Sequence, residues 1–356
     1  MLQWYSLTML AQIYINAVIN LYTAGARYSY SYKRVAAINT VAAFLSPIIS
    51  IAIITLTPFH AQGRIFGGAI ATALIALPLF ITILRGSRRL FNPEIWRYLF
   101  SMAIPLLPHY LSVAAILRIG EITVGRIHGT AALGKYSVAL SLGLSVSVIT
   151  GGLLSAIGPW VLRHIKSSDF DRIRKTLFLI TKGLCLFALL LLSVVPETIK
   201  ILTPTEYHSA LSAVYPLVLS SVPSFLSSVI TQGQMYYERT FYTSLPSVSA
   251  AAVSTIFSLM LLPRIRWQFV SLFVMLAYIT LFAVSCIIFK RLSGKMPIDF
   301  KRSCAVYLAT LLYAAFLLLL RENTLSRIIL AIPLLPLLLS VGFEAFSAIK
   351  EPRAEY

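Results

Sequence analysis

Apolar residues along this chain form eleven stretches of about twenty residues, separated by short connections that carry most of the charge. A helix needs roughly 20 apolar residues to cross the hydrocarbon core of a bilayer, so the pattern predicts eleven transmembrane helices. The fold class predicted is therefore all-α, a polytopic membrane protein. The predicted spans are residues 4–24, 34–57, 64–84, 97–119, 133–157, 175–195, 209–232, 240–262, 267–289, 303–321 and 325–347.

Composition supports the same class, because 58% of the residues are hydrophobic and only 12% are charged. The mean hydropathy of +0.84 lies far above that of soluble domains. The formal net charge of +18 raises the question of nucleic-acid binding. The basic residues stand in the connections and form no stripe with interleaved aromatics, so we expect membrane lipids, and no nucleic acid, as partners.

The basic residues alternate between the two sides of the predicted membrane. Most lie in connections near residues 25–34, 85–97, 163–175, 290–302 and the C-terminus. By the positive-inside rule this side is cytoplasmic, so the N-terminus is predicted outside and the C-terminus inside a cell inner membrane. The opposite side carries Arg64, Arg118, Arg126, Lys135, Lys200, Arg264, Arg266, Arg321 and Arg327, while Lys182 falls within a span.

Motifs for soluble catalysis are missing from the sequence. It has no phosphate-binding glycine loop, no HExxH and no paired CxxC, and Cys185, Cys286 and Cys304 stand singly in apolar segments. We therefore expect no metal and no cofactor. The outward connections are short and their acidic residues are scattered, which argues against an enzyme and favours a transporter.

Four short motifs carry a family resemblance. The run IPLLPHYLS at residues 104–112 is followed by GKYSVALSLG at 134–143, with Pro159 closing the second stretch. GRI at 63–65 stands before the third span, and EYHSA at 206–210 stands before the seventh. In this order the motifs resemble the polysaccharide and O-antigen (Wzx-type) flippases of the multidrug/oligosaccharidyl-lipid/polysaccharide (MOP) exporter superfamily. The resemblance covers essentially the whole chain.

The resemblance implies a MATE/MOP-like fold of two helical lobes around a central cavity. In the family the proline-containing helix is the seventh of fourteen or twelve, whereas here it is the fourth span, so about three N-terminal helices are expected to be absent. The implied parts are 1–95, a partial first lobe of three helices; 96–290, a lobe of six; and 291–356, two further helices with a short cytoplasmic tail.

The implied function is export of oligosaccharide repeat units linked to undecaprenyl diphosphate, for polysaccharide or O-antigen biosynthesis. A polysaccharide polymerase and other assembly proteins are further implied partners. Two alternatives stay open. One is a multidrug or other lipid exporter of the same superfamily, and the other is a non-transporting scaffold within a polysaccharide assembly complex.

Ionisable residues at membrane depth are costly and are the default candidates for substrate binding. Arg118 and Glu121 share a helix face and can pair, although the family often has an adjacent acidic-basic pair where this chain has Gly120-Glu121. Arg126 lies beyond them, and Lys182 lies about seven residues into its span. Each basic residue either holds the substrate diphosphate or reaches back to the membrane surface.

Polar residues on the central and first helices complete the candidates. Pro105 and Pro108 predict a break in the central helix, and His109 beside them is either a proton sensor or a hydrogen-bonded core residue. Asn16 and Asn20 form a stripe with Gln12 on the first span. That stripe either lines the cavity or joins helices through hydrogen bonds.

Overall fold

The described part of the chain is built from helices alone. The structure, a computed structural model, describes residues 2–29, 31–57, 60–86, 91–237 and 241–349, and no strand occurs among them. The predicted cytoplasmic tail therefore lies largely outside the described residues. The chain divides into two compact units, Met1–Arg97 and Tyr98–Tyr356.

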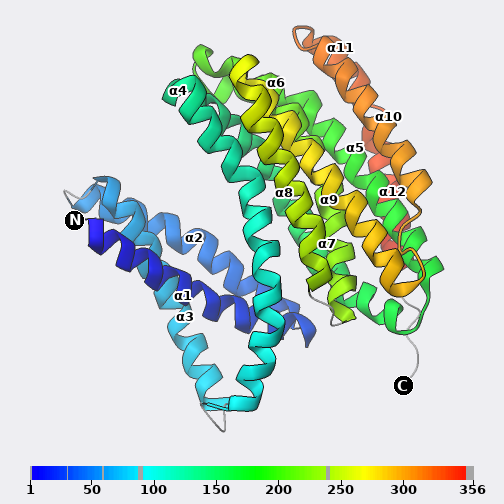
Figure 1. The fold of residues 1–356 in the computed structure, drawn as a ribbon. Coiled ribbons are helices and arrows are strands. Elements are labelled where there is room, and N and C mark those ends of the chain that lie inside the picture. The colour runs from blue at the N-terminus through cyan, green and yellow to red at the C-terminus, as the bar shows by residue number, and fades with distance from the viewer. Residues whose placement is uncertain (1, 30, 58–59, 87–90, 238–240, 350–356) are drawn as a thin grey trace. The chain divides into compact units, whose positions relative to one another are not determined.

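The first unit consists of α1 (Leu2–Tyr28), α2 (Tyr32–Leu56) and α3 (His60–Gly86), shown in blue in Figure 1. Helix α3 packs against both α1 and α2. The α2–α3 contact depends on Gly67, because a Cβ there would lie 2.5 Å from the Cα of Ser50. Small residues allow helix backbones to approach in this way in membranes.

The second unit begins with the long helix α4 (Pro93–Lys166), of which only the first residues belong to the first unit. Its backbone leaves helical geometry at Gly129, with φ of 85° and ψ of 173°, a conformation that glycine adopts without strain. The helix continues through Pro105 and Pro108. The break expected at these prolines is therefore found at Gly129, and it separates the predicted spans 97–119 and 133–157.

The remaining helices pack into one bundle (Figure 1). Helix α5 contacts α10 and α12, while α9 contacts α7 and α8. A left-handed Gly294 ends α9, and the carboxylates of Asp169 and Asp299 cap the starts of α5 and α10. The elements are α5 (Phe170–Leu202), η1 (Thr205–Ala210), α6 (Leu211–Leu219), α7 (Ser221–Tyr236), α8 (Phe241–Leu261), η2 (Leu262–Arg264), η3 (Trp267–Phe269), α9 (Val270–Ser293), α10 (Phe300–Leu319), α11 (Thr324–Ala331) and α12 (Leu334–Ile349).

Ten helical segments of the described chain are long and apolar enough to cross a membrane. One of them is α4, whose 74 residues contain two of the predicted spans on either side of Gly129. Large apolar side chains are exposed on most of these helices, such as Leu10 and Ile13 on α1 and Leu312 and Leu319 on α10. Such surfaces suit contact with lipid.

Candidate functional site: charged and polar groups within the helical spans

Arg118 and Glu121 form an ion pair on the first half of α4. The Arg118 guanidinium donates to a Glu121 carboxylate oxygen at 2.6 Å, which confirms the pairing expected from their spacing. The arginine side chain is 73% exposed and that of Glu121 is 21% exposed. The positive charge of Arg118 is therefore largely balanced by its own neighbour.

His109 takes part in a seam between the first half of α4 and α8. Its Nδ1 lies 3.2 Å from the carbonyl oxygen of Thr243, and the hydroxyl of Ser244 donates to the carbonyl of Pro105 at 2.6 Å. Further along, Ser254 donates to the carbonyl of Ile116 at 3.2 Å. Residue numbers rise together in both helices, so α4 and α8 run parallel, as the predicted topology requires for spans 97–119 and 240–262.

Lys182 lies in α5, between the buried residues Thr181 and Leu184. Its own side chain is half-buried, and its ammonium lies over the ring of Phe178 at 5.9 Å from the centroid. This cation–π contact joins residues one turn apart on the same helix. No carboxylate among the described residues forms an ion pair with Lys182.

The other predicted site residues are not gathered around Lys182. Arg126 is exposed beyond Glu121 on α4. Asn16 and Asn20 are exposed on α1 in the first unit, whereas Gln12 of the same stripe lies beside Gly68 of α3. Their roles in substrate binding stay predictions.

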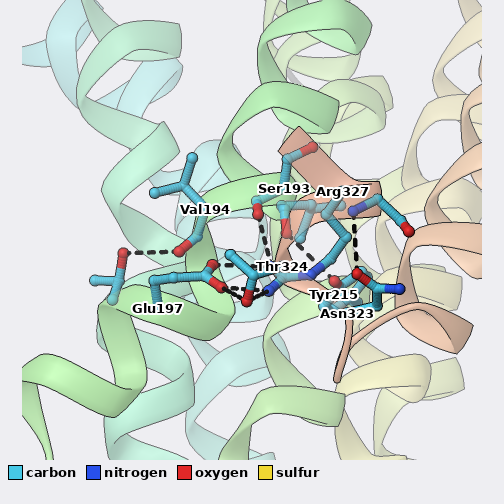
Figure 2. Close-up of polar contacts among 10 residues, drawn as sticks. Ser193, Val194, Glu197, Tyr215, Asn323, Thr324 and Arg327 are labelled. Atoms are coloured by element: carbon cyan, nitrogen blue, oxygen red, sulfur yellow. Dashed lines mark hydrogen bonds and ion pairs between the residues drawn. The ribbon is translucent and has the colours of Figure 1, made fainter. Parts of the chain in front are cut away.

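A buried ion pair between α5 and α11 was not expected from the sequence (Figure 2). Arg327 is only 1% exposed, and its guanidinium forms a two-point contact with the carboxylate of Glu197. It also donates to the carbonyl oxygen of Ser193 at 2.7 Å. In the sequence, Glu197 and Arg327 stand near the outward ends of two predicted spans, and no local pattern pairs them. Their opposite charges at the same predicted end of two spans were the available signal.

Neighbouring polar groups hold this pair in place. The hydroxyl of Thr324 donates to Glu197 at 2.9 Å, and the side chain of Asn323 caps the first turn of α11. Tyr215 of α6 lies beside the pair, with its hydroxyl donating to the carbonyl of Leu192 at 3.3 Å. The arrangement fixes the start of the last span against α5.

Most of the described carboxylates of the second unit thus form ion pairs or cap helices. Glu121 and Glu197 are held by arginines, Asp171 pairs with Arg174, and Asp169 and Asp299 cap helices. Glu344 is exposed near the end of α12. Among the described residues, no group of three or more His, Cys, Asp or Glu side chains is arranged to hold a metal ion. Among the described residues of this unit, the half-buried ammonium of Lys182 has no ion-pair partner.

The described part of the chain is all-helical and contains ten helices long and apolar enough to span a bilayer, which places the protein in the class of multi-pass membrane proteins. Comparisons with protein-family models, with curated proteins and with solved structures find no match to this chain.

Proposed function

We propose that this chain is an exporter of the polysaccharide-flippase type, which moves lipid-diphosphate-linked oligosaccharide repeat units across the cytoplasmic membrane. The proposal rests first on the order and spacing of the motifs around Pro105, Gly134 and Pro159, which resemble that family. The succession of long apolar helices joined by short connections supports it. Such a chain has room for membrane transport and little room for a soluble catalytic domain.

The observation that carries the proposal is the cation of Lys182. A half-buried ammonium about seven residues into an apolar span is costly unless it has a function or a counter-charge. The described carboxylates leave it without an ion-pair partner. A lipid diphosphate supplies the missing negative charge, and charge-assisted hydrogen bonds are the strong interactions available for holding it away from water.

The same distribution of charge argues against a multidrug exporter coupled to cations. That activity calls for a carboxylate inside the membrane that is free to bind a cation or a proton. Glu121 and Glu197 are both held by arginines, and Glu344 is exposed at the end of its helix. An anionic substrate therefore fits the second unit better than a cationic one.

The test is substitution of Lys182 in the native gene, with surface polysaccharide as the readout. Lys182→Ala should abolish export of the glycan while the amount of protein in the membrane stays unchanged. Lys182→Arg keeps the charge and should retain part of the activity. The matched control is Lys175→Ala, because Lys175 is an exposed cation two turns earlier on the same helix.

Normal export by Lys182→Ala would contradict the proposed role of this cation. Loss of export in Lys175→Ala to the same degree would show that the charge acts at the membrane surface and not inside the unit. A scaffold without transport activity predicts that all three variants behave like the wild type.

A further inference from the structure

Two neighbouring cavities open at one end of the second unit, where α5, α6, α10 and the 264–269 connection meet. One, of about 420 Å³, is polar and is lined by Lys200, His208, Arg266, Arg321 and Glu322 among others. The second, of about 560 Å³, is largely apolar and extends between α6, α9 and α10. They share the lining residues Ser212, Arg266, Gln268 and Arg321, so they form one continuous site.

Most of the charged side chains that line the polar cavity are positive. Lys200, Arg266 and Arg321 face a single lining carboxylate, that of Glu322. Glu322 contacts Arg321 at 3.3 Å, and within the described part of the chain neither Lys200 nor Arg266 has an ion-pair partner. Two cations therefore stay free to bind an anion.

Uncharged groups in the same cavity also lack partners. Nε2 of His208 and Oε1 of Gln268 are enclosed, and neither has a hydrogen-bond partner among the described residues. Enclosed polar atoms without partners are uncommon in folded proteins. An imidazole N–H and a side-chain amide, which can turn its NH₂ group towards a ligand, are suited to donate to phosphate oxygens.

The apolar cavity determines what kind of anion fits. Leu219 of α6, Leu272 and Met275 of α9, and Leu311 and Leu318 of α10 line it. Between residues 311 and 318, α10 rises by roughly 10 Å, so this cavity reaches about two helical turns from the basic end. A hydrocarbon chain fills such a space, whereas a soluble anion leaves it empty.

The position of the basic cavity also needs an explanation. Its cations are among the few that the charge pattern predicts on the outward side, where lysine and arginine are disfavoured in short connections. Lys200, Arg266 and Arg321 are far apart in the sequence, yet the fold brings them around one cavity. The positive-inside rule does not explain three cations at one place on the outward side, whereas a bound anionic ligand does.

We propose that this site binds an anionic lipid, with its phosphate-bearing headgroup between Lys200, Arg266 and Arg321 and its hydrocarbon chain in the apolar cavity. On the predicted topology the lipid comes from the outer leaflet. The site is separate from Lys182, and the proposal does not depend on the chain being an exporter.

The test is a native mass-spectrometry titration of the detergent-purified full chain. Dioleoyl phosphatidic acid is the probe, and dioleoyl phosphatidylcholine, with the same chains and a zwitterionic headgroup, is the lipid control. Phosphatidic acid should bind at least tenfold more tightly than phosphatidylcholine. The double variant Lys200→Gln/Arg266→Gln should lose that preference, whereas Arg264→Gln should keep it, because Arg264 is exposed on the same connection and lines neither cavity.

A second variant tests the hydrocarbon part of the site. Ala315 lines the apolar cavity and is exposed, so Ala315→Phe narrows the cavity without disturbing the buried core. It should weaken phosphatidic acid binding at least tenfold while inorganic pyrophosphate binding stays as in the wild type. Equal loss in Arg264→Gln, no preference for phosphatidic acid, or full binding by Ala315→Phe would each overturn the proposal, the last in favour of a soluble anion.

Discussion

Removing Glu197 should destabilise the second unit more than any single surface change. Glu197→Leu leaves the guanidinium of Arg327, only 1% exposed, with the carbonyl of Ser193 and the hydroxyl of Thr324 as its polar partners. Breaking a buried ion pair in this way costs roughly 3–5 kcal/mol, because one charge stays buried without compensation. The side chain of Glu197 is 30% exposed, so we expect a value near the lower end, about 3 kcal/mol.

Replacing Arg327 should lower the free energy of unfolding by less than replacing Glu197 does. Arg327→Leu leaves the carboxylate of Glu197 uncompensated, but that group keeps partial access to solvent and its contact with Thr324. We expect a loss of about 1–3 kcal/mol, typical of a polar group left without its partner. The double variant Glu197→Leu/Arg327→Leu removes both charges and should lie within about 1 kcal/mol of the wild type.

The assay is SDS-induced unfolding of the purified protein, followed by far-UV circular dichroism, as a double-mutant cycle. The control is Asp171→Asn, which removes an exposed ion pair with Arg174 on the same helix and should cost under about 1 kcal/mol. A double variant as unstable as Glu197→Leu would refute the reasoning, since the cost would then come from lost packing and not from an unpaired charge.

Three further changes test the fold itself. A reporter fused after Arg174 should read cytoplasmic and one fused near Thr205 should read outside, and swapped signals would reverse the orientation. Gly67→Ala should destabilise the first unit by about 1–3 kcal/mol, because its Cβ would lie 2.5 Å from the Cα of Ser50. The control Gly68→Ala should be tolerated, because its Cβ would lie at an ordinary 3.5 Å from the nearest side-chain atom, Nε2 of Gln12. Gly129→Ala should cost about 1–3 kcal/mol through strain at φ of 85°, while Gly134→Ala, with its nearest atoms at 3.8 Å, should not; equal unfolding midpoints for these two variants would contradict the break at Gly129.

The helices themselves could be predicted well from the sequence, because membrane spans depend on a local property, the length of an apolar stretch. The predicted spans 97–119 and 133–157 both lie on α4, and the spacing of Arg118 and Glu121 correctly indicated their ion pair. The position of the break in α4 could not be predicted from the sequence. Proline is the residue expected to break a helix, yet the helix continues through Pro105 and Pro108 and departs from helical geometry at Gly129.

Long-range pairing could not be predicted from the sequence. Glu197 and Arg327 are 130 residues apart, and only the packing of α11 on α5 selects them as partners. The same holds for Lys200, Arg266 and Arg321, which meet because the last turn of α5 and the connections after α8 and α10 converge at one end of the bundle. Charge pattern gives the side of the membrane, but tertiary packing decides which charges are neighbours.

The central claim, export of lipid-linked glycan, is tested most directly by disrupting the native gene and measuring lipid-diphosphate-linked repeat units in the two leaflets of the cytoplasmic membrane. The proposed activity predicts that these units accumulate in the cytoplasmic leaflet while surface polysaccharide is lost, and that reintroducing the gene restores both. An unchanged distribution of the repeat units between the leaflets, with normal surface polysaccharide, would contradict the claim.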